Sequence, residues 1–569
     1  MNAVADLQTQ PWHAIYAECG INPVLPEIAE KSLADYIESH AKSLGSSPAM
    51  EYLGATVTYA ELDQLANRLA NVLQKIGVQK GDVIGMHLPN TPQYLISLVA
   101  AAKVGAAISG VSPLLTPSEL THQINDAHIK VLISLDQLNA PIAQIDGKAP
   151  TLKALLVTGP IDPLPSWKKW LAYKLKKLNK VTPAPMQHVK VLDFWSELQK
   201  SPATRVYTKL THADTIYIQY TGGTTGKPKG AETSLYNMFA NARQCEAFAV
   251  YTPGSDTLAA AFPYFHMAGL SLALLGMQQA ARILIVPDPR NVEMFCKVMQ
   301  KYPPTFLANV PTLYQMLYEH PEFKKIDFSR LKMAMSGAAP FPPEMIHHLE
   351  AIIGQGKLAE VYGMTETSPL LTCNPPTRPK IGSVGVPAVG TIIKIVDVET
   401  GTREMPLGEP GELIACGPQV MKGYLHLPEA TAKTVRELEG KTWIYTGDIA
   451  KMDAEGYVSI CDRSKDMLIV GGYKVFSVEV EGKLAELDFI ELSALIGQPD
   501  EKRPGNDIVH LYIQLKAGAK NENQDELREK VLLFCREQMA AYKIPKHVHF
   551  LDALPLTAVG KLDKKALRP

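Results

Sequence analysis

The sequence predicts an α/β protein in which a large N-terminal domain of stacked helix and strand layers precedes a small, mobile α+β domain. Its 569 residues are too many for a single small core. Helical periodicity alternates with short β-branched runs, and the pattern changes near residues 390 and 462. We therefore expect an N-terminal domain over residues 1–461, with a β-rich subdomain from about residue 390, a hinge at 462–472, and a C-terminal domain over 473–569.

The alternation is clearest between residues 57 and 136. Residues 60–76 place apolar side chains at helical spacing, and the run GDVIGMHL (residues 81–88) that follows is typical of a buried strand. Residues 94–104 repeat the helical pattern before a second apolar run, AAISGV. Since such units pack helices against sheets, stacked α/β layers are expected here.

Later segments favour short strands. TIIKIVDV, GELIACG and GYVSICD are separated by Gly, Pro and Asp turns, which predicts the β-rich subdomain. The charged, glycine-containing residues 462–472 suit a hinge. Beyond them, IVHLYIQLK and KHVHFLD read as strands around a helix at residues 525–539, which predicts a small α+β lid.

Composition excludes several classes of protein. The net charge of -1 provides no global field toward nucleic acid, so no nucleic-acid partner is expected. Seven scattered cysteines without a C-x-x-C pair indicate free thiols in a reducing compartment, and the N-terminus lacks a signal-peptide pattern, so we expect a cytoplasmic location. Residues 258–277 are apolar enough to suggest a membrane span, but Pro263 and His266 inside them favour a core strand and helix.

A basic amphipathic segment, SWKKWLAYKLKKLNK (residues 166–180), stands apart. No Asp or Glu occurs between Pro163 and Leu192. Such a helix can lie on an anionic membrane surface, which would make the protein peripheral on the inner face; the alternative is a helix packed on its own domain with solvated lysines. The apolar face predicted for this helix consists of Trp167, Trp170, Leu171, Leu175 and Leu178.

The strongest chemical signal is YIQYTGGTTGKPKG (residues 217–230), an apolar strand that runs into a loop of Gly and Thr ending in lysines. Glycines let backbone N–H groups approach an anion, and hydroxyls and ammonium groups add donors, so the loop suits polyphosphate. A Walker A loop fails on spacing, and Pro228 replaces its Ser or Thr; a flexible turn is the other alternative. The candidate ATP-binding residues are Thr221, Gly222, Gly223, Thr224, Thr225, Gly226, Lys227 and Lys229.

TGGTTGKPKG resembles the phosphate loop of the AMP-forming adenylating enzymes, the superfamily of acyl-CoA synthetases, amino-acid adenylation domains and beetle luciferases. Further motifs of that superfamily follow in its order, so the resemblance covers residue 57 to the end. They are FPYFHMAG, VPTLYQML, SGAAPF, VYGMTET, GSVGVP, GELIACGPQVMKGY, YTGD, DRSKD, GGYKVFSVEVE and LPLTAVGKLDKKALR.

The resemblance gives these motifs roles that the residue types can support. The Glu366 carboxylate would hold Mg²⁺ against the phosphates, with Thr225 as a second ligand and Thr365 as a hydroxyl donor. Asp448 would accept the ribose hydroxyls, completed by Arg463, although a lone Thr-Gly-Asp is otherwise a turn. An adenine would slide beside the small residues of SGAAP and an aromatic ring; these positions are Gly337, Ala338, Ala339, Tyr362, Gly363 and Met364.

Other roles follow from the resemblance alone. Lys561 matches the lysine that bridges the carboxylate substrate and the α-phosphate, and Lys465 matches the hinge residue. His266 would position the substrate near its carboxylate. The thiol tunnel would be lined by Gly471, Gly472 and Tyr473. Leu235 departs from the family, which commonly has His at this position, and this affects the detail of substrate placement.

The motifs are most similar to those of bacterial long-chain fatty-acid CoA ligases, and FPYFHMAG lacks the Asp of amino-acid adenylation domains. The expected activity is ATP-dependent activation of a medium- to long-chain fatty acid to acyl-AMP, followed by transfer to coenzyme A, with Mg²⁺ as cofactor. Short-chain or aromatic acids, a non-catalytic acyl or nucleotide binder, and a luciferase-type oxygenase stay open as alternatives. Self-association into a homodimer is a further hypothesis.

Overall fold

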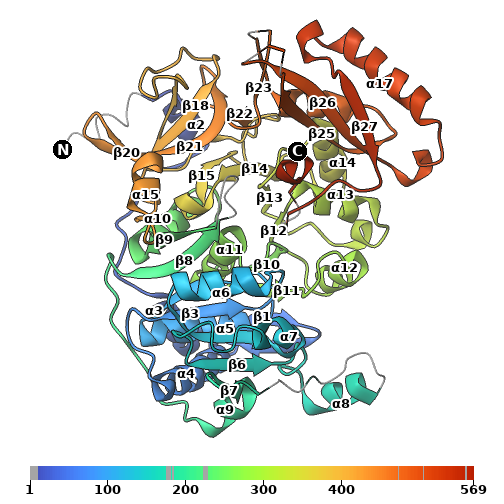
Figure 1. The fold of residues 1–569 in the computed structure, drawn as a ribbon. Coiled ribbons are helices and arrows are strands. Elements are labelled where there is room, and N and C mark those ends of the chain that lie inside the picture. Colours follow the sequence, from blue (N-terminus) through green and yellow to red (C-terminus); the bar gives the residue numbers. More distant parts are fainter. Residues whose placement is uncertain are drawn as a thin grey trace.

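The computed structural model describes residues 10–174, 181, 185–221, 228–471, 473–500, 502–503, 505–557 and 561–568. Two large sheets with their helices form the body of the molecule, and a small α+β unit made of the last hundred residues lies over one end (Figure 1). The predicted α/β class is confirmed.

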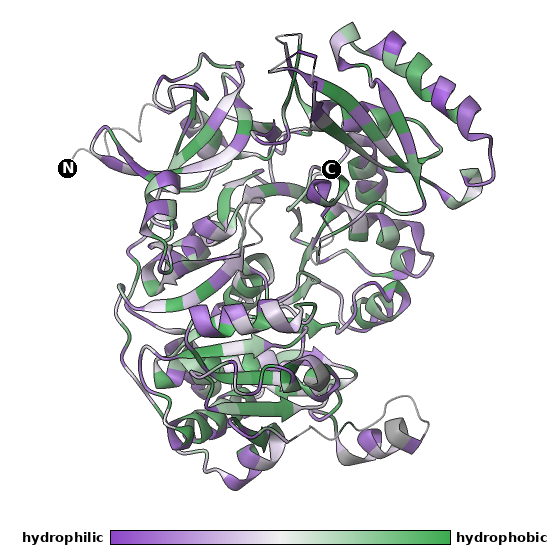
Figure 2. Cartoon of the chain, viewed as in Figure 1, coloured by the Kyte–Doolittle hydropathy of each residue, from purple (hydrophilic) through white to green (hydrophobic). Residues whose placement is uncertain are grey.

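The first sheet has eight strands in the order β19-β9-β8-β4-β3-β5-β6-β7, parallel from β8 to β7 and antiparallel at β9 and β19. Its central strands are buried, and many of their residues are hydrophobic (Figure 2). The strands are β3 Val83–His87, β4 Ala107–Gly110, β5 Ile129–Leu135, β6 Ala154–Thr158, β7 Lys190–Asp193, β8 Thr215–Thr221, β9 Lys229–Ser234 and β19 Gly423–Tyr424.

The second sheet has nine strands in the order β16-β15-β14-β13-β12-β10-β11-β1-β2, and β14 to β1 are parallel. Parallel strands bring their carboxyl ends to one edge, where α/β proteins bind ligands. The strands are β1 Pro48–Tyr52, β2 Ala55–Thr58, β10 Thr257–Ala260, β11 Arg282–Ile285, β12 Phe306–Asn309, β13 Met333–Ser336, β14 Leu358–Gly363, β15 Leu370–Cys373 and β16 Val386–Pro387.

A shared core fills the space between the two sheets. It contains buried residues of α3 (Leu33–Ser43), α4 (Tyr59–Ile76), α5 (Pro92–Val104), α10 (Leu235–Glu246) and α11 (Met267–Gln278). The predicted helix at residues 60–76 is confirmed as α4, which begins at a Thr58–Glu61 capping box and ends at Gly77 with φ +94°. The apolar residues 258–277 form β10 and α11, and no helix in the described part of the chain is long and apolar enough to cross a membrane.

Other helices flank the sheets. The far side of the nine-stranded sheet packs on α12 (Val292–Lys301), α13 (Pro311–Glu319) and α14 (Pro343–Ile353). The segment at residues 166–180 forms α8 (Ser166–Lys174), and its Leu175 and Leu178 lie outside the described residues. Four more helices are α6 Pro117–Asp126, α7 Asn139–Ala143, α9 Phe194–Lys200 and α15 Pro428–Thr434.

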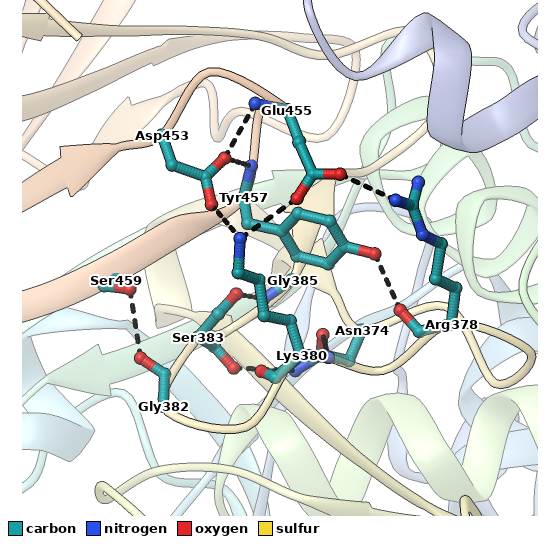
Figure 3. A network of polar contacts seen from close by, with 10 residues as sticks. All are labelled: Asn374, Arg378, Lys380, Gly382, Ser383, Gly385, Asp453, Glu455, Tyr457 and Ser459. Atoms are coloured by element: carbon teal, nitrogen blue, oxygen red, sulfur yellow. Dashed lines mark hydrogen bonds and ion pairs between the residues drawn. The ribbon is translucent and has the colours of Figure 1, made fainter. Parts of the chain in front are cut away.

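Antiparallel strands form the third layer, a five-stranded sheet of β17 (Ile392–Val396), β18 (Gly411–Cys416), β20 (Val435–Leu438), β21 (Lys441–Met452) and β22 (Val458–Arg463). Hydrogen bonds and ion pairs hold the turn before β22 in place, as the polar network of Figure 3 shows.

In that network Lys380 pairs with Asp453 at 2.5 Å and Glu455 at 3.1 Å, and Arg378 pairs with Glu455 at 2.6 Å (Figure 3). Arg378 also pairs with Glu18 at 2.8 Å. Glu18 belongs to the N-terminal helix α2 (His13–Glu18). Since exposed ion pairs contribute little stability, we infer that the network orients the turn and α2 rather than holding the fold.

The C-terminal unit has its own hydrophobic core. Its three-stranded sheet consists of β25 (Ile490–Pro499), β26 (Asp507–Leu515) and β27 (His547–Leu551). The predicted helix at residues 525–539 is α17, Gln524–Gln538. The unit is completed by α16 Ser477–Leu484 and the hairpin of β23 Leu468–Val470 and β24 Tyr473–Val475.

Candidate active site

The Asp448 carboxylate lies in the middle of a three-residue cluster. Asp448 and Arg463 are cross-strand partners of β21 and β22, and Arg463 Nε lies 3.3 Å from Asp448 Oδ1. Tyr362, at the end of β14, donates its hydroxyl to the other carboxylate oxygen at 2.5 Å. Burial raises the pKa of Asp448, and the Arg463 charge and the Tyr362 hydroxyl act against that rise. The structure therefore brings together three residues that the sequence analysis proposed for nucleotide binding.

The backbone around Asp448 is a bulged strand and not a turn. Residues 446–448 run inside the long strand β21, and Gly447 adopts φ +71°, a region that favours glycine. The register of β21 against β18 shifts at this place, between Glu412 and Ile414. Because a bulge re-aims neighbouring side chains, the glycine turns Asp448 toward Tyr362.

Glu366 follows the same strand, β14, in a buried 3-10 turn with Thr365. Its Oε1 accepts a hydrogen bond from the Tyr424 hydroxyl at 2.7 Å. Lys229, the first residue of β9, lies over the Tyr424 ring with its Nζ 4.6 Å from the ring centroid. Thr221 pairs with Lys229 across the ends of β8 and β9. Glu366 and the described ends of the predicted phosphate loop are thus linked through one tyrosine.

The backbone at the carboxyl end of β13 is unusual at Ala338. This residue adopts φ +72°, a strained conformation for a side chain with a Cβ, and it is exposed together with Ala339. A Cβ on Gly337 would come within 2.9 Å of Val361, and one on Gly363 within 1.9 Å of the Pro369 carbonyl oxygen. Small residues are therefore required here, and Met364 extends the turn by donating its N–H to Pro369 O at 3.0 Å.

His266 caps the N-terminus of α11, where its Nδ1 accepts from Ala268 N at 3.5 Å. Its loop is held from the other sheet: Asn90 donates to Phe262 O at 3.0 Å and accepts from Tyr264 N at 2.8 Å. Burial and the nearby Lys561 charge lower the pKa of His266 to about 4. The imidazole is therefore neutral at pH 7.

Lys561 reaches this region from the C-terminal unit. Burial and the Arg463 charge lower its pKa to about 8, while Asp448 acts in the opposite direction. Since these groups and His266 interact electrostatically with it, the ammonium lies near residues from β21, β22 and the start of α11. The structure thus brings the charge of the predicted adenylation lysine within electrostatic range of the Asp448 cluster, across the two parts of the chain.

Other predicted residues lie outside this cluster. The carbonyl of Lys465 accepts from Arg568 at 2.9 Å. Gly471 follows β23, and Tyr473 begins β24, where it is exposed and stacks on Tyr542 with ring centroids 4.6 Å apart. The predicted residues outside the described part of the chain are Gly222, Gly223, Thr224, Thr225, Gly226, Lys227 and Gly472.

Sequence reasoning missed residues that position the site from a distance. Tyr424 orients Glu366, and Asn90 and Gln219 hold the loop before His266, with Gln219 donating to Phe265 O at 2.8 Å. Tyr424 closes the quoted motif GELIACGPQVMKGY, which offered a signal. Asn90 and Gln219 offered none, because their partners lie 172 and 46 residues away.

Two family models match the chain. The model described as AMP-binding enzyme covers residues 37–425, and the one described as AMP-binding enzyme C-terminal domain covers residues 479–561. Among solved structures, the anthranilate CoA ligase AuaEII in complex with anthranoyl-AMP is similar, with a TM-score of 0.82, 25% identity and coverage of 94% of this chain and 96% of that one. ATP-bound MatB from Rhodopseudomonas palustris gives a TM-score of 0.79 at 28% identity, covering 94% and 98%.

Curated relatives extend the similarity along nearly the whole chain. A long-chain-fatty-acid–CoA ligase of Bacillus subtilis is 34% identical over 568 residues, covering 99% of this chain and 98% of the relative. One of Escherichia coli is 32% identical, covering 95% and 94%, and a feruloyl-CoA synthase of Amycolatopsis is 31% identical, covering 95% and 99%. With a family model over residues 37–425 and such relatives, the chain belongs to the AMP-binding enzymes.

Proposed function

We propose that this enzyme activates a medium- to long-chain fatty acid with ATP and transfers the acyl group to coenzyme A, releasing pyrophosphate and AMP. The observation that carries the proposal is the cluster of Asp448, Arg463 and Tyr362, together with a Lys561 charge close enough to act on Asp448 and His266. A partly desolvated ammonium beside a carboxylate that can accept ribose hydroxyls suits a bound adenylate, because the ammonium would face the phosphate while the carboxylate faces the sugar.

In the first half-reaction a fatty-acid carboxylate oxygen attacks the α-phosphorus of ATP, and the bond from that phosphorus to pyrophosphate breaks. Negative charge grows on the phosphoryl oxygens, and the partly desolvated Lys561 ammonium stabilises it. Asp448 accepts the ribose hydroxyls with Arg463 beside it. Neutral His266 positions the carboxylate without pairing with it as a cation.

In the second half-reaction the thiol sulfur of coenzyme A attacks the acyl carbonyl carbon, AMP leaves, and the thiol proton passes to solvent. Lys465 would serve as the hinge for a rotation that brings the hairpin of Gly471 and Tyr473, with Gly472 between them, to the acyl-adenylate. Tyr473 is 59% exposed, so its ring is accessible for such a contact.

A Mg²⁺ site at Glu366 fits the residues present. Mg²⁺ retains several waters and takes one or two carboxylates plus substrate phosphates. Glu366 offers a buried carboxylate whose orientation is set by Tyr424, and Thr365 precedes it; the predicted ligand Thr225 lies outside the described residues. When bound, the ion would neutralise phosphate charge.

The length of the acid is inferred from the relatives. Those of Bacillus subtilis and Escherichia coli are named for long-chain fatty acids, which supports the same class here. The anthranilate ligase and the feruloyl-CoA synthase support an aromatic acid as the second candidate. Light-emitting oxygenation and a non-catalytic binder stay as alternatives from the sequence.

We also propose a cytoplasmic location with contact to an anionic membrane surface through α8. Seven free cysteines support a reducing compartment. Trp167 and Trp170 are 63% and 61% exposed, while Lys168 ties the helix to the body by donating to Gly54 O at 2.7 Å. Exposed indoles beside lysines match the interface of an anionic bilayer. Homodimer formation stays a prediction.

The reaction is tested by AMP release from ATP and Mg²⁺ across acids from acetate to oleate, with and without coenzyme A. We expect coenzyme A-dependent release that is greatest for medium- and long-chain acids and falls by at least about 10²-fold in Lys561→Ala, because one stabilising charge is lost. Activity confined to short-chain or aromatic acids would exclude the fatty-acid proposal, and inactivity with every acid would favour the binder.

The pH dependence of adenylation tests the Lys561 ammonium. This group acts when protonated, so kcat/KM for pyrophosphate exchange should hold below pH 8 and decline as the pH rises through its pKa of about 8. In Lys561→Arg the residual rate should be flat through that range, because a guanidinium stays charged. An unchanged alkaline decline in Lys561→Arg would assign the titration to another group.

Membrane contact is tested by sedimentation with anionic liposomes. Replacing Trp167 and Trp170 with Ser should abolish most binding, since each buried indole contributes the apolar part of the interaction. The matched control replaces Val250 and Leu407, which are 80% and 58% exposed elsewhere on the surface, with Ser. The proposal is contradicted if the two double variants bind the liposomes equally well. It is also contradicted if the wild-type protein does not bind them.

A further inference from the structure

A buried polar cluster lies at the base of the segment that carries Lys561. Its members, hereafter the Ser477 cluster, are Asp462, Ser477, Glu481 and Lys564. Asp462 lies in β22, Ser477 and Glu481 in α16, and Lys564 at the start of the C-terminal 3-10 turn. Ser477 and Asp462 are 0% and 2% exposed, and the side chains of Lys564 and Glu481 are 12% and 16% exposed, so most of the cluster is shielded from water.

Every charged group in the cluster has a partner. Lys564 Nζ donates to Ser477 Oγ at 2.5 Å and pairs with Glu481 Oε1 at 2.7 Å. The Ser477 hydroxyl donates to Asp462 Oδ1 at 3.0 Å, and the Ser477 N–H donates to the other carboxylate oxygen. The carboxylate of Asp462 thereby lies at the N-terminus of α16, where the helix dipole favours an anion. Burial raises the pKa of Glu481 to about 7, and the Lys564 charge acts against that rise.

The cluster is connected to Lys561 through very few bonds. Lys561 O accepts from Thr557 N at 2.7 Å, and its N–H donates to Thr557 Oγ1 at 3.2 Å. Leu562 then bridges to Leu556, and Asp563 N donates to Pro555 O at 2.8 Å. Lys564 is the next residue after Asp563, so its ammonium fixes the C-terminal end of this short pair of hydrogen-bonded segments. The N-terminal end of the same pair of segments is held by Leu554 N, which donates to Gln514 Oε1 at 2.8 Å.

We propose that Lys564 is a positioning residue for Lys561: its ammonium, held by Ser477 and Glu481, sets where the Lys561 side chain enters the Asp448 site. The proposal rests on the proposed role of Lys561 in adenylation. A displacement of about 1 Å at a reacting centre can cost about 10²-fold in rate, so an anchor three residues away controls the chemistry without touching it. Lys565, the next residue, is exposed and suits a control.

The position of the contacts relative to the proposed hinge predicts which half-reaction depends on them. The Asp462–Ser477 bonds cross residue 465, whereas the bonds of Lys564 to Ser477 and Glu481 lie wholly after it. Lys564 therefore anchors Lys561 from within the C-terminal unit, and its own bonds need not break in a rotation about residue 465. No step of the proposed second half-reaction uses the Lys561 ammonium, so thioester formation should not depend on Lys564.

The experiment assays the two half-reactions separately in the full-length enzyme. Adenylation is followed by pyrophosphate exchange, and thioester formation by adding prepared dodecanoyl-adenylate and coenzyme A. Lys564→Met should slow adenylation about 10- to 100-fold. Thioester formation should stay within about two-fold of wild type. Lys564→Arg should restore most of the adenylation rate, and Lys565→Met should leave both half-reactions unchanged.

The outcomes separate this proposal from the function on which it rests. Exchange absent in the wild type, or retained in Lys561→Ala, overturns the adenylation role of Lys561. Exchange lost in Lys561→Ala but kept in Lys564→Met, or an equal loss of both half-reactions in Lys564→Met, overturns the positioning role. If Lys564→Met does not fold, Glu481→Gln replaces it, because this variant keeps the volume and removes the charge that holds the ammonium; it should also slow adenylation selectively.

Discussion

The charge balance around Asp448 is the constraint on which the rest of the site depends. A buried carboxylate needs cationic or hydrogen-bonding partners, and here these come from three places in the chain: Arg463 on the neighbouring strand, Tyr362 on the nine-stranded sheet, and Lys561 from the C-terminal unit. Satisfying one carboxylate therefore brings the five-stranded sheet, the nine-stranded sheet and the C-terminal unit to one point. A nucleotide would enter where these charges meet.

Much of the fold could be predicted because its signals are local. The helix α4 has apolar spacing, a capping box and a terminal glycine within twenty residues of one another, and the buried strand β3 directly follows it. The division of the strands into two sheets could not be predicted, since β1 pairs with β11 across more than two hundred residues. The segment around Asp448 was typical of a turn because it contains Thr-Gly-Asp, yet the pairing of β21 with β18 and β22 makes it a bulged strand.

The site residues also fall into those that the sequence predicts and those that only the folded structure shows. Lys561, Asp448 and Arg463 were predicted by motif, and the structure brings them together. Asn90, Gln219 and Tyr424 act through contacts that only the folded chain creates, and the Ser477 cluster joins residues up to 102 positions apart, from Asp462 to Lys564. The residues proposed to touch the nucleotide carry a recognisable pattern, whereas those that hold them in place do not.

The central claim is that one site holds an adenylate and a long acyl chain together. Calorimetric binding of non-hydrolysable acyl-sulfamoyl-adenosines with dodecanoyl and acetyl chains tests it directly. Because each buried CH₂ contributes about 0.8 kcal/mol, the account predicts that the dodecanoyl compound binds at least about 10²-fold more tightly, and that Asp448→Asn weakens both compounds. Equal affinity for the two chains, or binding unaffected by Asp448→Asn, would contradict it.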